Sequence, residues 1–345
     1  LWKGVTIGGK VYSVPTYKDS SMAQFWYFDD QYVQKYHIDV NNIRTMQDLD
    51  KPFRDMKEGE GKGFYPLQMS QGSPFNGFFN EYDGLTAGLQ PLGVKVDDQT
   101  RTVICTLEQP DIMENLKLLH QWYQDGIINP DANVLTEPQK KLPFASAQGW
   151  SSAVATWQVL NGVEKYDAFK VFGPLYSTDT IQGSMNAVSI NSKYKDECLK
   201  FLQLVNTDSK LRDMLAYGVP DKTFVYVGDG VIKKQTDTWP LAAYTQGTFF
   251  NMSITEDADP DQWDQVKKQN EEAVSSSCLG FSLDLTNIKH EMSNCLNVWQ
   301  KYKYDLLTGA SDPETAVPAV IQELKAAGFD TVVQEAQKQI NEFYN

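Results

Sequence analysis

The first residues of the chain contain a near match to a phosphate-binding loop. Gly4, Gly9 and Lys10 fit most of the pattern G-x-x-x-x-G-K-[ST], in which backbone amides cradle a phosphate. The match fails at its last position, because Val11 stands where a hydroxyl group that binds magnesium is required. A strand-like run follows, in place of the helix whose N-terminus would face the phosphate. The sequence therefore predicts a β-hairpin over residues 5–14 and no nucleotide site.

Cysteine and histidine side chains could bind a metal or act as nucleophiles, but their spacing supports neither. No C-x-x-C or H-E-x-x-H pattern joins the four cysteines and three histidines, which are Cys105, Cys198, Cys278, Cys295, His37, His120 and His290. Cys198 and Cys295 lie in helical patterns, so we expect buried free thiols there, and Cys278 with Cys295 is the one pair worth testing for a disulfide. The acidic stretch 256–264 lacks the glycine and glutamate of a calcium loop and predicts a solvated helix start. We expect no metal, no cofactor and no catalytic residue.

Composition narrows the function classes further. The 345 residues carry 41% hydrophobic and 22% charged side chains and a formal net charge of −14, with no basic stripe, which argues against nucleic acid as a partner. The sequence has no run of about 18 apolar residues, so no transmembrane helix is predicted. Aromatic residues, eight Trp among them, make up 12% of the chain and can supply stacking surfaces or core volume. The chain is long enough for two domains with full cores.

Helical and strand-like patterns alternate along the chain, which indicates an α/β architecture. From apolar spacing and cap residues we predict helices over 29–37, 46–57 with an interruption at Lys51-Pro52, 111–125, 195–205, 286–308, 312–326 and 330–344. Strands are predicted over 169–175 and 185–190, and 221–265 is predicted to be irregular. Trp122 and Trp299 fall on apolar helical faces and are expected in the core.

Three segments carry a resemblance to a known family. GKVYSVPTYKDSSMAQFWYFDDQYVQKYHID at 9–39 resembles the stretch in which bacterial extracellular solute-binding proteins of ABC importers, the maltose-binding class, cross from the first lobe into the second. SMNAVSINSKYKDECLKFLQLVNTDSKLRDMLAYGV at 184–219 resembles their return segment. The tail from Gly280 is similar to the C-terminal module of the LipO-like lipoprotein subfamily, with G-F-x-x-D, L-x-x-G-x-x-D-P, L-x-x-A-G and E-x-x-x-Q in that order. The resemblance implies an α/β, periplasmic-binding-protein type II-like two-lobe fold.

The same resemblance predicts how the chain divides. Residues 1–18 and 172–218 are expected to be a remnant of the first lobe with the hinge crossing, 19–171 the second α/β lobe, 219–280 an irregular, aromatic-rich segment near the cleft, and 281–345 a helical module packing on the second lobe. In this family about a hundred residues of the first lobe, preceded by a lipoprotein signal, normally come before the segment that begins at 9. We therefore expect the first lobe to be incomplete in this chain.

Ligand-binding residues are predicted from the family pattern and from their chemistry. A carbohydrate needs aromatic faces against its C–H side, and amides or charged groups that pair with its hydroxyls. Trp150, which follows Gly149, takes the position where the maltose-binding family stacks a tryptophan on the sugar, and its alternative role is core packing. Weaker candidates, each with a purely structural alternative, are Tyr17, Lys18, Asp19, Asn186, Trp239, Tyr244, Gln246 and Asn251. Phe281 and Asp284 could close the back of the pocket or simply pack.

These inferences predict that the protein is the substrate-binding component of an ABC importer. It would capture a carbohydrate in the interlobe cleft and deliver it to the transmembrane permease. The many aromatic residues of the chain favour an oligosaccharide as that carbohydrate. The resemblance implies a monomer at the extracellular face of the cytoplasmic membrane, lipid-anchored through a preceding segment, or a periplasmic protein. Two alternatives stay open. One is a sensory or adhesive binding protein of the same fold. The other is a glycoside hydrolase, although the sequence singles out no carboxylate pair for that chemistry.

Overall fold

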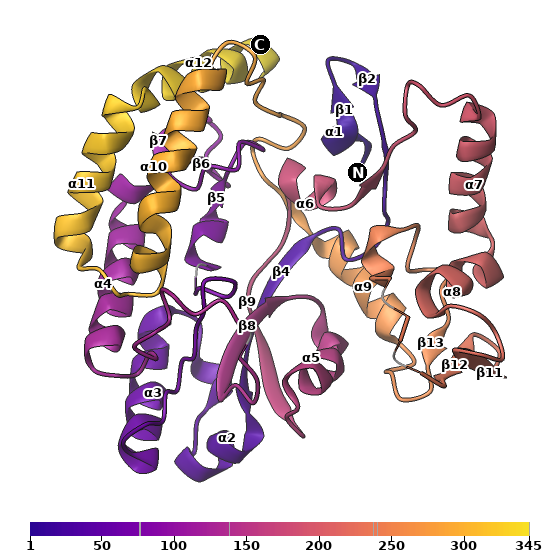
Figure 1. Ribbon diagram of the computed structural model, residues 1–345, viewed down its shortest axis with the longest axis horizontal. Helices are drawn as coiled ribbons and strands as arrows, with labels where there is room; N and C mark the ends of the chain where they lie inside the picture. The colour runs from indigo at the N-terminus through magenta and orange to yellow at the C-terminus, as the bar shows by residue number, and fades with distance from the viewer. Residues whose placement is uncertain (76, 138, 237, 240, 345) are drawn as a thin grey trace. The chain divides into compact units, whose positions relative to one another are not determined.

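The computed structural model describes residues 1–75, 77–137, 139–236, 238–239 and 241–344, and the chain forms two compact units (Figure 1). Unit 1 comprises Leu1–Met22, Trp150–Ala153 and Pro174–Gly280. Unit 2 comprises Ala23–Gly149, Val154–Gly173 and Phe281–Asn345. Residues 219–280, expected as a separate segment, thus share unit 1 with the pieces 1–22 and 174–218, and the four residues from Trp150 also belong to unit 1.

Unit 2 is built from helices around short sheets. Its described helices are α2 (Asp30–Tyr36), α3 (Met46–Glu60), α4 (Pro110–Gln124), α5 (Val154–Asn161), α10 (Lys289–Leu307), α11 (Pro313–Ala326) and α12 (Phe329–Tyr344), with 3-10 turns η1 (Val40–Asn42), η2 (Gly77–Glu81) and η3 (Thr106–Glu108). Its strands are β4 (Met22–Asp29), β5 (Tyr82–Asp83), β6 (Leu92–Lys95), β7 (Ile104–Cys105), β8 (Phe144–Gln148) and most of β9 (Tyr166–Tyr176). The predicted helices of this unit are confirmed to within a few residues at their ends.

Strand β4 organises the core of unit 2. It lies between β9 and β8, and it pairs with β8 in antiparallel register. Because side chains alternate along a strand, Trp26 and Phe28 enter the main hydrophobic core, where α3 and α4 contribute their apolar faces. Phe25 and Tyr27 take the other face and contact Trp157 of α5, with Tyr27 stacked at a ring-centroid distance of 4.8 Å. The predicted strand at 169–175 is confirmed as part of β9.

Helix α3 corrects one sequence expectation. An interruption was predicted around Lys51-Pro52, but the helix runs continuously with Pro52 inside it. A proline in a helix interior costs about 3 kcal/mol, since it removes one hydrogen bond and crowds the preceding turn. A capping box between Thr45 and Asp48 starts the helix, and an apolar face that includes Phe53 is fully buried. These two features outweigh the cost of the proline.

The C-terminal helices form one bundle with α4. Figure 1 shows α10 and α11 beside α4, and contacts join α10, α11 and α12 to one another. Asp312 caps α11 and Pro313 opens it, which is the arrangement its sequence predicted. Trp122 and Trp299 are buried on the inner faces of α4 and α10, as expected. Phe281 is buried against Phe343 of α12, so its structural alternative, packing, is the one observed.

Unit 1 consists of shorter elements. Its described helices are α1 (Trp2–Val5), α6 (Thr178–Gln182), α7 (Lys195–Thr207), α8 (Ser209–Tyr217) and α9 (Gln262–Glu272), with 3-10 turns η4 (Ser151–Ala153) and η5 (Ala243–Thr245). Its strands are β1 (Thr6–Ile7), β2 (Lys10–Val11), β3 (Val14–Pro15), β10 (Met185–Asn186), β11 (Phe224–Gly228), β12 (Val231–Lys234), β13 (Ile254–Thr255) and β14 (Val274–Ser275). β14 pairs with Leu175 and Tyr176, the end of β9 that belongs to this unit.

Three expectations for unit 1 need correction. The N-terminal hairpin exists, but it is shorter than 5–14, because Val5 ends α1 and only β1 and β2 pair. The strand predicted over 185–190 is limited to β10, which pairs with β3 over two residues. The region 221–265, predicted to be irregular, contains the sheet β11-β12-β13. β13 joins that sheet from about twenty residues away in parallel register, a non-local pairing that no local pattern reveals.

The structure also tests the expectations about a disulfide, buried thiols and transmembrane helices. All four cysteines are free thiols, so Cys278 and Cys295 form no disulfide. Cys295 is buried as expected, whereas Cys198 is only half-buried. Among the described residues, no helix combines the length and the apolar character needed to cross a membrane.

Candidate functional site

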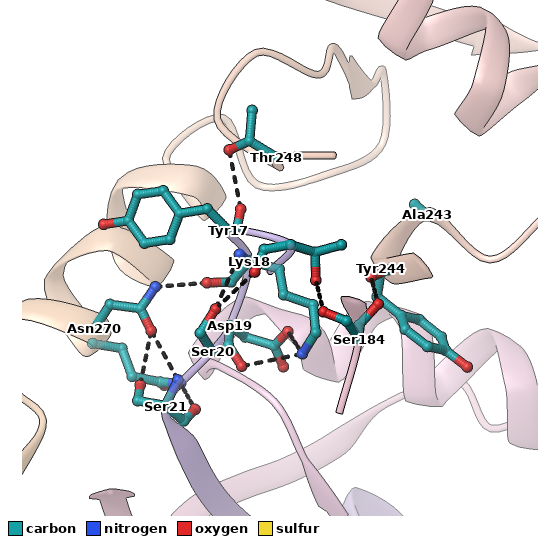
Figure 2. A network of polar contacts seen from close by, with 12 residues as sticks. Tyr17, Lys18, Asp19, Ser20, Ser21, Ser184, Ala243, Tyr244, Thr248 and Asn270 are labelled. Atoms are coloured by element: carbon teal, nitrogen blue, oxygen red, sulfur yellow. Dashed lines mark hydrogen bonds and ion pairs between the residues drawn. The ribbon is translucent and has the colours of Figure 1, made fainter. Parts of the chain in front are cut away.

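The segment Thr16–Ser21 of unit 1 is held by a buried polar network (Figure 2). Lys18 and Asp19 form an ion pair with 3.0 Å between Nζ and Oδ1, and their side chains are only 10% and 12% exposed. The side-chain amide of Asn270 accepts from the backbone N–H of Ser21 at 3.0 Å and donates to the carbonyl oxygen of Lys18 at 2.6 Å. The solvated turn considered for these residues is therefore wrong, because both charges are buried and face each other.

Tyr17 joins this segment to the loop at 248–250. Its carbonyl oxygen accepts hydrogen bonds from the N–H of Phe249 and the hydroxyl of Thr248, both at 3.0 Å. Its ring meets the ring of Phe250 edge-on, with centroids 4.6 Å apart. Tyr17 remains 38% exposed, so part of this residue is accessible to solvent.

Two predicted residues, Asn186 and Tyr244, are brought together by backbone contacts. Asn186 in β10 donates from its amide to the carbonyl oxygen of Thr245 at 3.2 Å, and the Ser184 hydroxyl donates to the carbonyl oxygen of Tyr244 at 2.7 Å. Figure 2 shows the Tyr244 ring directed away from Lys18, and the side chain is 52% exposed. Ser184 and Asn186 therefore hold the turn that carries Tyr244, whose role in binding stays a prediction.

Trp150 lies in an aromatic cluster of unit 1. Its ring centroid is 6.0 Å from that of Phe249 and 6.1 Å from that of Trp263, and the cluster packs on the buried Met252. The side chain is half-buried. Trp150 thus packs in the fold, as its structural alternative predicts, and its stacking on a ligand stays a prediction.

Polar atoms beside this cluster lack protein partners. The indole N–H of Trp150, the hydroxyl of Ser152 and both amide atoms of Asn251 are buried with no hydrogen-bond partner in the described part of the chain. Leaving such an atom unsatisfied costs about 1–3 kcal/mol, so native proteins supply water or a ligand there. An indole donor and an amide with donor and acceptor atoms are the groups that pair with hydroxyls. Their donor and acceptor chemistry suits hydroxyl groups.

The remaining predicted residues are placed less favourably. Trp239 is 41% exposed, but its N–H donates to the carbonyl oxygen of Leu215 at 2.9 Å, which fixes the ring against α8. Gln246 is half-buried on the loop that follows η5. Asp284 caps its own turn by accepting from the N–H and hydroxyl of Thr286, and hydrogen bonds from Thr286 lower its pKa.

Sequence reasoning missed two buried charged residues that hold the loop formed by residues 243–253. Arg212 in α8 is fully buried and donates to the carbonyl oxygens of Thr248 and Ala243 at 2.8 Å and 2.7 Å. The next residue, Asp213, accepts from the N–H and the hydroxyl of Ser253 at 2.8 Å and 2.7 Å. The two side chains therefore fix both ends of residues 243–253, the loop that carries Tyr244, Gln246 and Asn251. Adjacent opposite charges inside a mostly apolar helix were the signal that could have identified them.

Unit 2 contains a cavity that sequence reasoning also missed. Its volume is about 270 Å³. Trp26 and Met46 are its buried members, and Phe78, Val171 and Phe172 form half-buried apolar walls. Polar side chains complete the lining, namely Gln24, Arg44, Gln47, Glu81, Asp111, Glu114 and Asn115. The lining comes from β4, α3, η2, α4 and β9, so no single stretch of sequence identifies it.

Carboxylates dominate the charge of this cavity. Glu81, Asp111 and Glu114 face a single basic lining residue, Arg44. The hydroxyl of Tyr82 donates to both oxygens of Asp111 at 2.8 Å and 2.9 Å, which orients that carboxylate. Glu81 is exposed over part of its surface, yet partial burial of its carboxyl group is the main reason that its pKa is raised. No group of three or more His, Cys, Asp or Glu side chains in the described ranges is arranged to hold a metal ion.

The chain is similar to known solute-binding proteins in sequence. Residues 1–224 match a family model described as bacterial extracellular solute-binding protein, and residues 277–345 match a domain of unknown function, DUF3502. The second match covers the tail that the sequence analysis singled out. A curated carbohydrate ABC transporter substrate-binding protein from Streptococcus pneumoniae serotype 4 is 28% identical to the chain, over 99% of the chain and 71% of the relative.

Solved structures share the fold. The N-glycan transport solute-binding protein NgtS from Streptococcus pneumoniae aligns with 99% of this chain and 77% of its own, at a TM-score of 0.86 and 24% identity. The same protein in complex with Man5GlcNAc aligns at a TM-score of 0.82. An HMO-binding solute-binding protein from Bifidobacterium longum infantis aligns with 99% of this chain and 79% of its own, at a TM-score of 0.63 and 17% identity. Across these proteins the two-lobe α/β fold is the shared feature, as the sequence predicted.

Proposed function

The chain belongs to the bacterial extracellular solute-binding proteins, and on that premise we propose that it is the carbohydrate-binding component of an ABC importer. The protein captures an oligosaccharide outside the cell and delivers it to the transmembrane subunits of the permease. The curated relative, which carries that description and aligns along 99% of this chain, supports the substrate class. We further propose that it acts as a monomer, with a lipid anchor at the outer face of the cytoplasmic membrane.

One observation in the structure carries the carbohydrate assignment. Beside the Trp150 cluster, the buried indole N–H, the Ser152 hydroxyl and the Asn251 amide have no partner within the described residues. Sugars combine an apolar C–H face with hydroxyls that both donate and accept, so they match an accessible aromatic edge next to unpaired amide and hydroxyl groups. Tyr17 and Tyr244 add exposed aromatic surface in the same unit.

Within unit 1, the polar groups near Trp150 favour binding of a glycan without its hydrolysis. A glycoside hydrolase needs two carboxyl groups facing each other across the scissile bond, one of them often with a raised pKa. In unit 1, the buried Asp19 is paired with Lys18, and Asp213 accepts two hydrogen bonds from Ser253. These carboxylates therefore stabilise the fold, and the aromatic and amide groups are left for the ligand.

Isothermal titration calorimetry with a panel of neutral oligosaccharides tests the proposal. We expect at least one glycan to bind with a dissociation constant in the micromolar range or below, and we expect Asn251→Ala to weaken that binding roughly tenfold, the worth of one or two hydrogen bonds. Asn341→Ala, which removes an exposed amide from α12, is the matched control and should leave binding unchanged. Binding of amino acids or peptides, with no heat from any glycan, would contradict the proposal.

A further inference from the structure

The cavity in unit 2 has the composition of a sugar subsite, although none of its residues was predicted to bind. Its volume of about 270 Å³ falls just below the range of roughly 300–1,000 Å³ that is typical of small-molecule pockets, so it suits one sugar ring better than a whole oligosaccharide. Phe78 and Phe172 offer aromatic surface, and Gln24 and Asn115 offer amides. Aromatic faces beside amides and carboxylates are the combination that binds a sugar ring.

Trp26 provides an independent indication that something polar occupies the cavity. It lines the cavity and is only 6% exposed, and its indole N–H is buried with no hydrogen-bond partner among the residues that the structure describes. Most buried polar groups in proteins are paired with protein or with ordered water. Trp26 therefore brings an unused hydrogen-bond donor to the wall of the cavity, and a hydroxyl oxygen is a chemically suitable acceptor for it.

The charge of the lining limits which sugars fit. Three carboxylates, on Glu81, Asp111 and Glu114, face the single guanidinium of Arg44. A carboxylate accepts hydrogen bonds from sugar hydroxyls but repels another carboxylate, and because these side chains are exposed, salt weakens that repulsion. The Asp111 carboxylate is already oriented by Tyr82, so it is fixed in place before any ligand arrives.

We propose that this cavity is a binding subsite for one neutral sugar residue and that its carboxylates select against uronic and sialic acids. The inference rests on the proposed function and names the substrate class more narrowly, as neutral glycans. It also assigns roles. Trp26 donates to a sugar hydroxyl, Glu114 accepts from one, and Phe78 covers the C–H face.

Indole N–H signals of tryptophan-labelled protein test the inference directly. We expect titration with mannose, galactose and N-acetylglucosamine, followed by the best neutral oligosaccharide of the panel, to shift the Trp26 signal, which Trp26→Phe assigns by its disappearance. Glucuronic acid and N-acetylneuraminic acid should leave the signal in place. Calorimetry should show that Glu114→Gln weakens neutral-glycan binding about fivefold or more, a change of about 1 kcal/mol. Glu58→Gln, an exposed glutamate on α3 outside the cavity, should have no effect.

The outcomes separate this inference from the proposed function. If a neutral glycan binds by calorimetry while the Trp26 signal and the Glu114→Gln affinity stay unchanged, the subsite is refuted and the carbohydrate-binding function stands. If acidic sugars shift the Trp26 signal as strongly as neutral ones, the charge selection is refuted. If no saccharide binds in either experiment, the proposed function fails, and this inference fails with it.

Discussion

Replacement of Trp150 by alanine tests the aromatic cluster of unit 1. The side chain is half-buried, with ring centroids at 6.0 Å from Phe249 and 6.1 Å from Trp263. Truncation of a fully buried tryptophan costs about 3–5 kcal/mol. Because part of the indole is exposed, we expect Trp150→Ala to lower the local opening free energy of this cluster by about 2–3 kcal/mol, a figure that includes the two aromatic contacts.

Hydrogen-exchange mass spectrometry measures this loss where it occurs. A decrease of about 2–3 kcal/mol corresponds to exchange that is roughly 30- to 150-fold faster, and it should appear in α9 and in the loop at 248–253. Helices α3 and α4 belong to unit 2 and serve as the internal reference, with no expected change. Exchange in α9 that changes less than twofold would refute the packing role of Trp150.

Trp150→Phe is the matched variant that separates packing from polar contact. Phenylalanine keeps an aromatic ring against Phe249 and Trp263, so we expect a loss of stability below about 1.5 kcal/mol. It removes the indole N–H, which is buried without a partner in the described structure. If glycan binding falls as far in Trp150→Phe as in Trp150→Ala, the N–H contacts the ligand. If the phenylalanine variant binds like the wild type, stacking is the contribution that matters.

Two more predictions follow from buried groups. Asp213→Asn replaces one of the two oxygens that accept from Ser253, so we expect guanidinium denaturation to show a loss of about 1–3 kcal/mol, and a change below about 0.5 kcal/mol would contradict the clamp. Burial raises the pKa of Cys105 and Cys295 to about 11, which leaves a thiolate fraction on the order of 0.1% at pH 8. The half-buried Cys198 should therefore react first with a thiol reagent in the native protein, and equal rates for all cysteines would be inconsistent with this burial.

Local patterns in the sequence were sufficient where an element is long and carries its own signals. α11 has an aspartate cap, a proline at its first position and apolar residues at helical spacing, and it was predicted almost to the residue. The sheet β11-β12-β13 was missed, because β13 has only two residues and becomes a strand through its parallel pairing with β12. Pro52 misled the prediction for α3, since tertiary burial of that helix overrides a strong local penalty.

The candidate site shows the same division between local and long-range information. Residue type and position in the sequence suggested Trp150 and Asn251 as candidates. Trp150 lies in the aromatic cluster of unit 1, and Asn251 lies beside it. The burial of Lys18 could not be foreseen, because it depends on Asn270, which lies 252 residues further along the chain. The cavity beside Trp26 could not be predicted from the sequence, because it also depends on residues that are far apart in the chain. On β4, Trp26 reads as an ordinary core residue, and only the side chains brought from other elements create a space beside it.

The contacts that hold the loop formed by residues 243–253 in unit 1 affect both the stability of the fold and the cost of binding a ligand. Residues 243–253 contain little regular structure, and a free loop of that length would lose substantial conformational entropy on binding a ligand. Arg212 and Asp213 reduce that cost in advance, because they bind the loop near both of its ends from inside α8. Burying these two charges is costly, and four hydrogen bonds to the loop offset part of that cost, although Nη1 of Arg212 is buried with no partner among the described residues. The amide of Asn251 is then held, buried and without a partner among the described residues, in a loop that both ends already anchor.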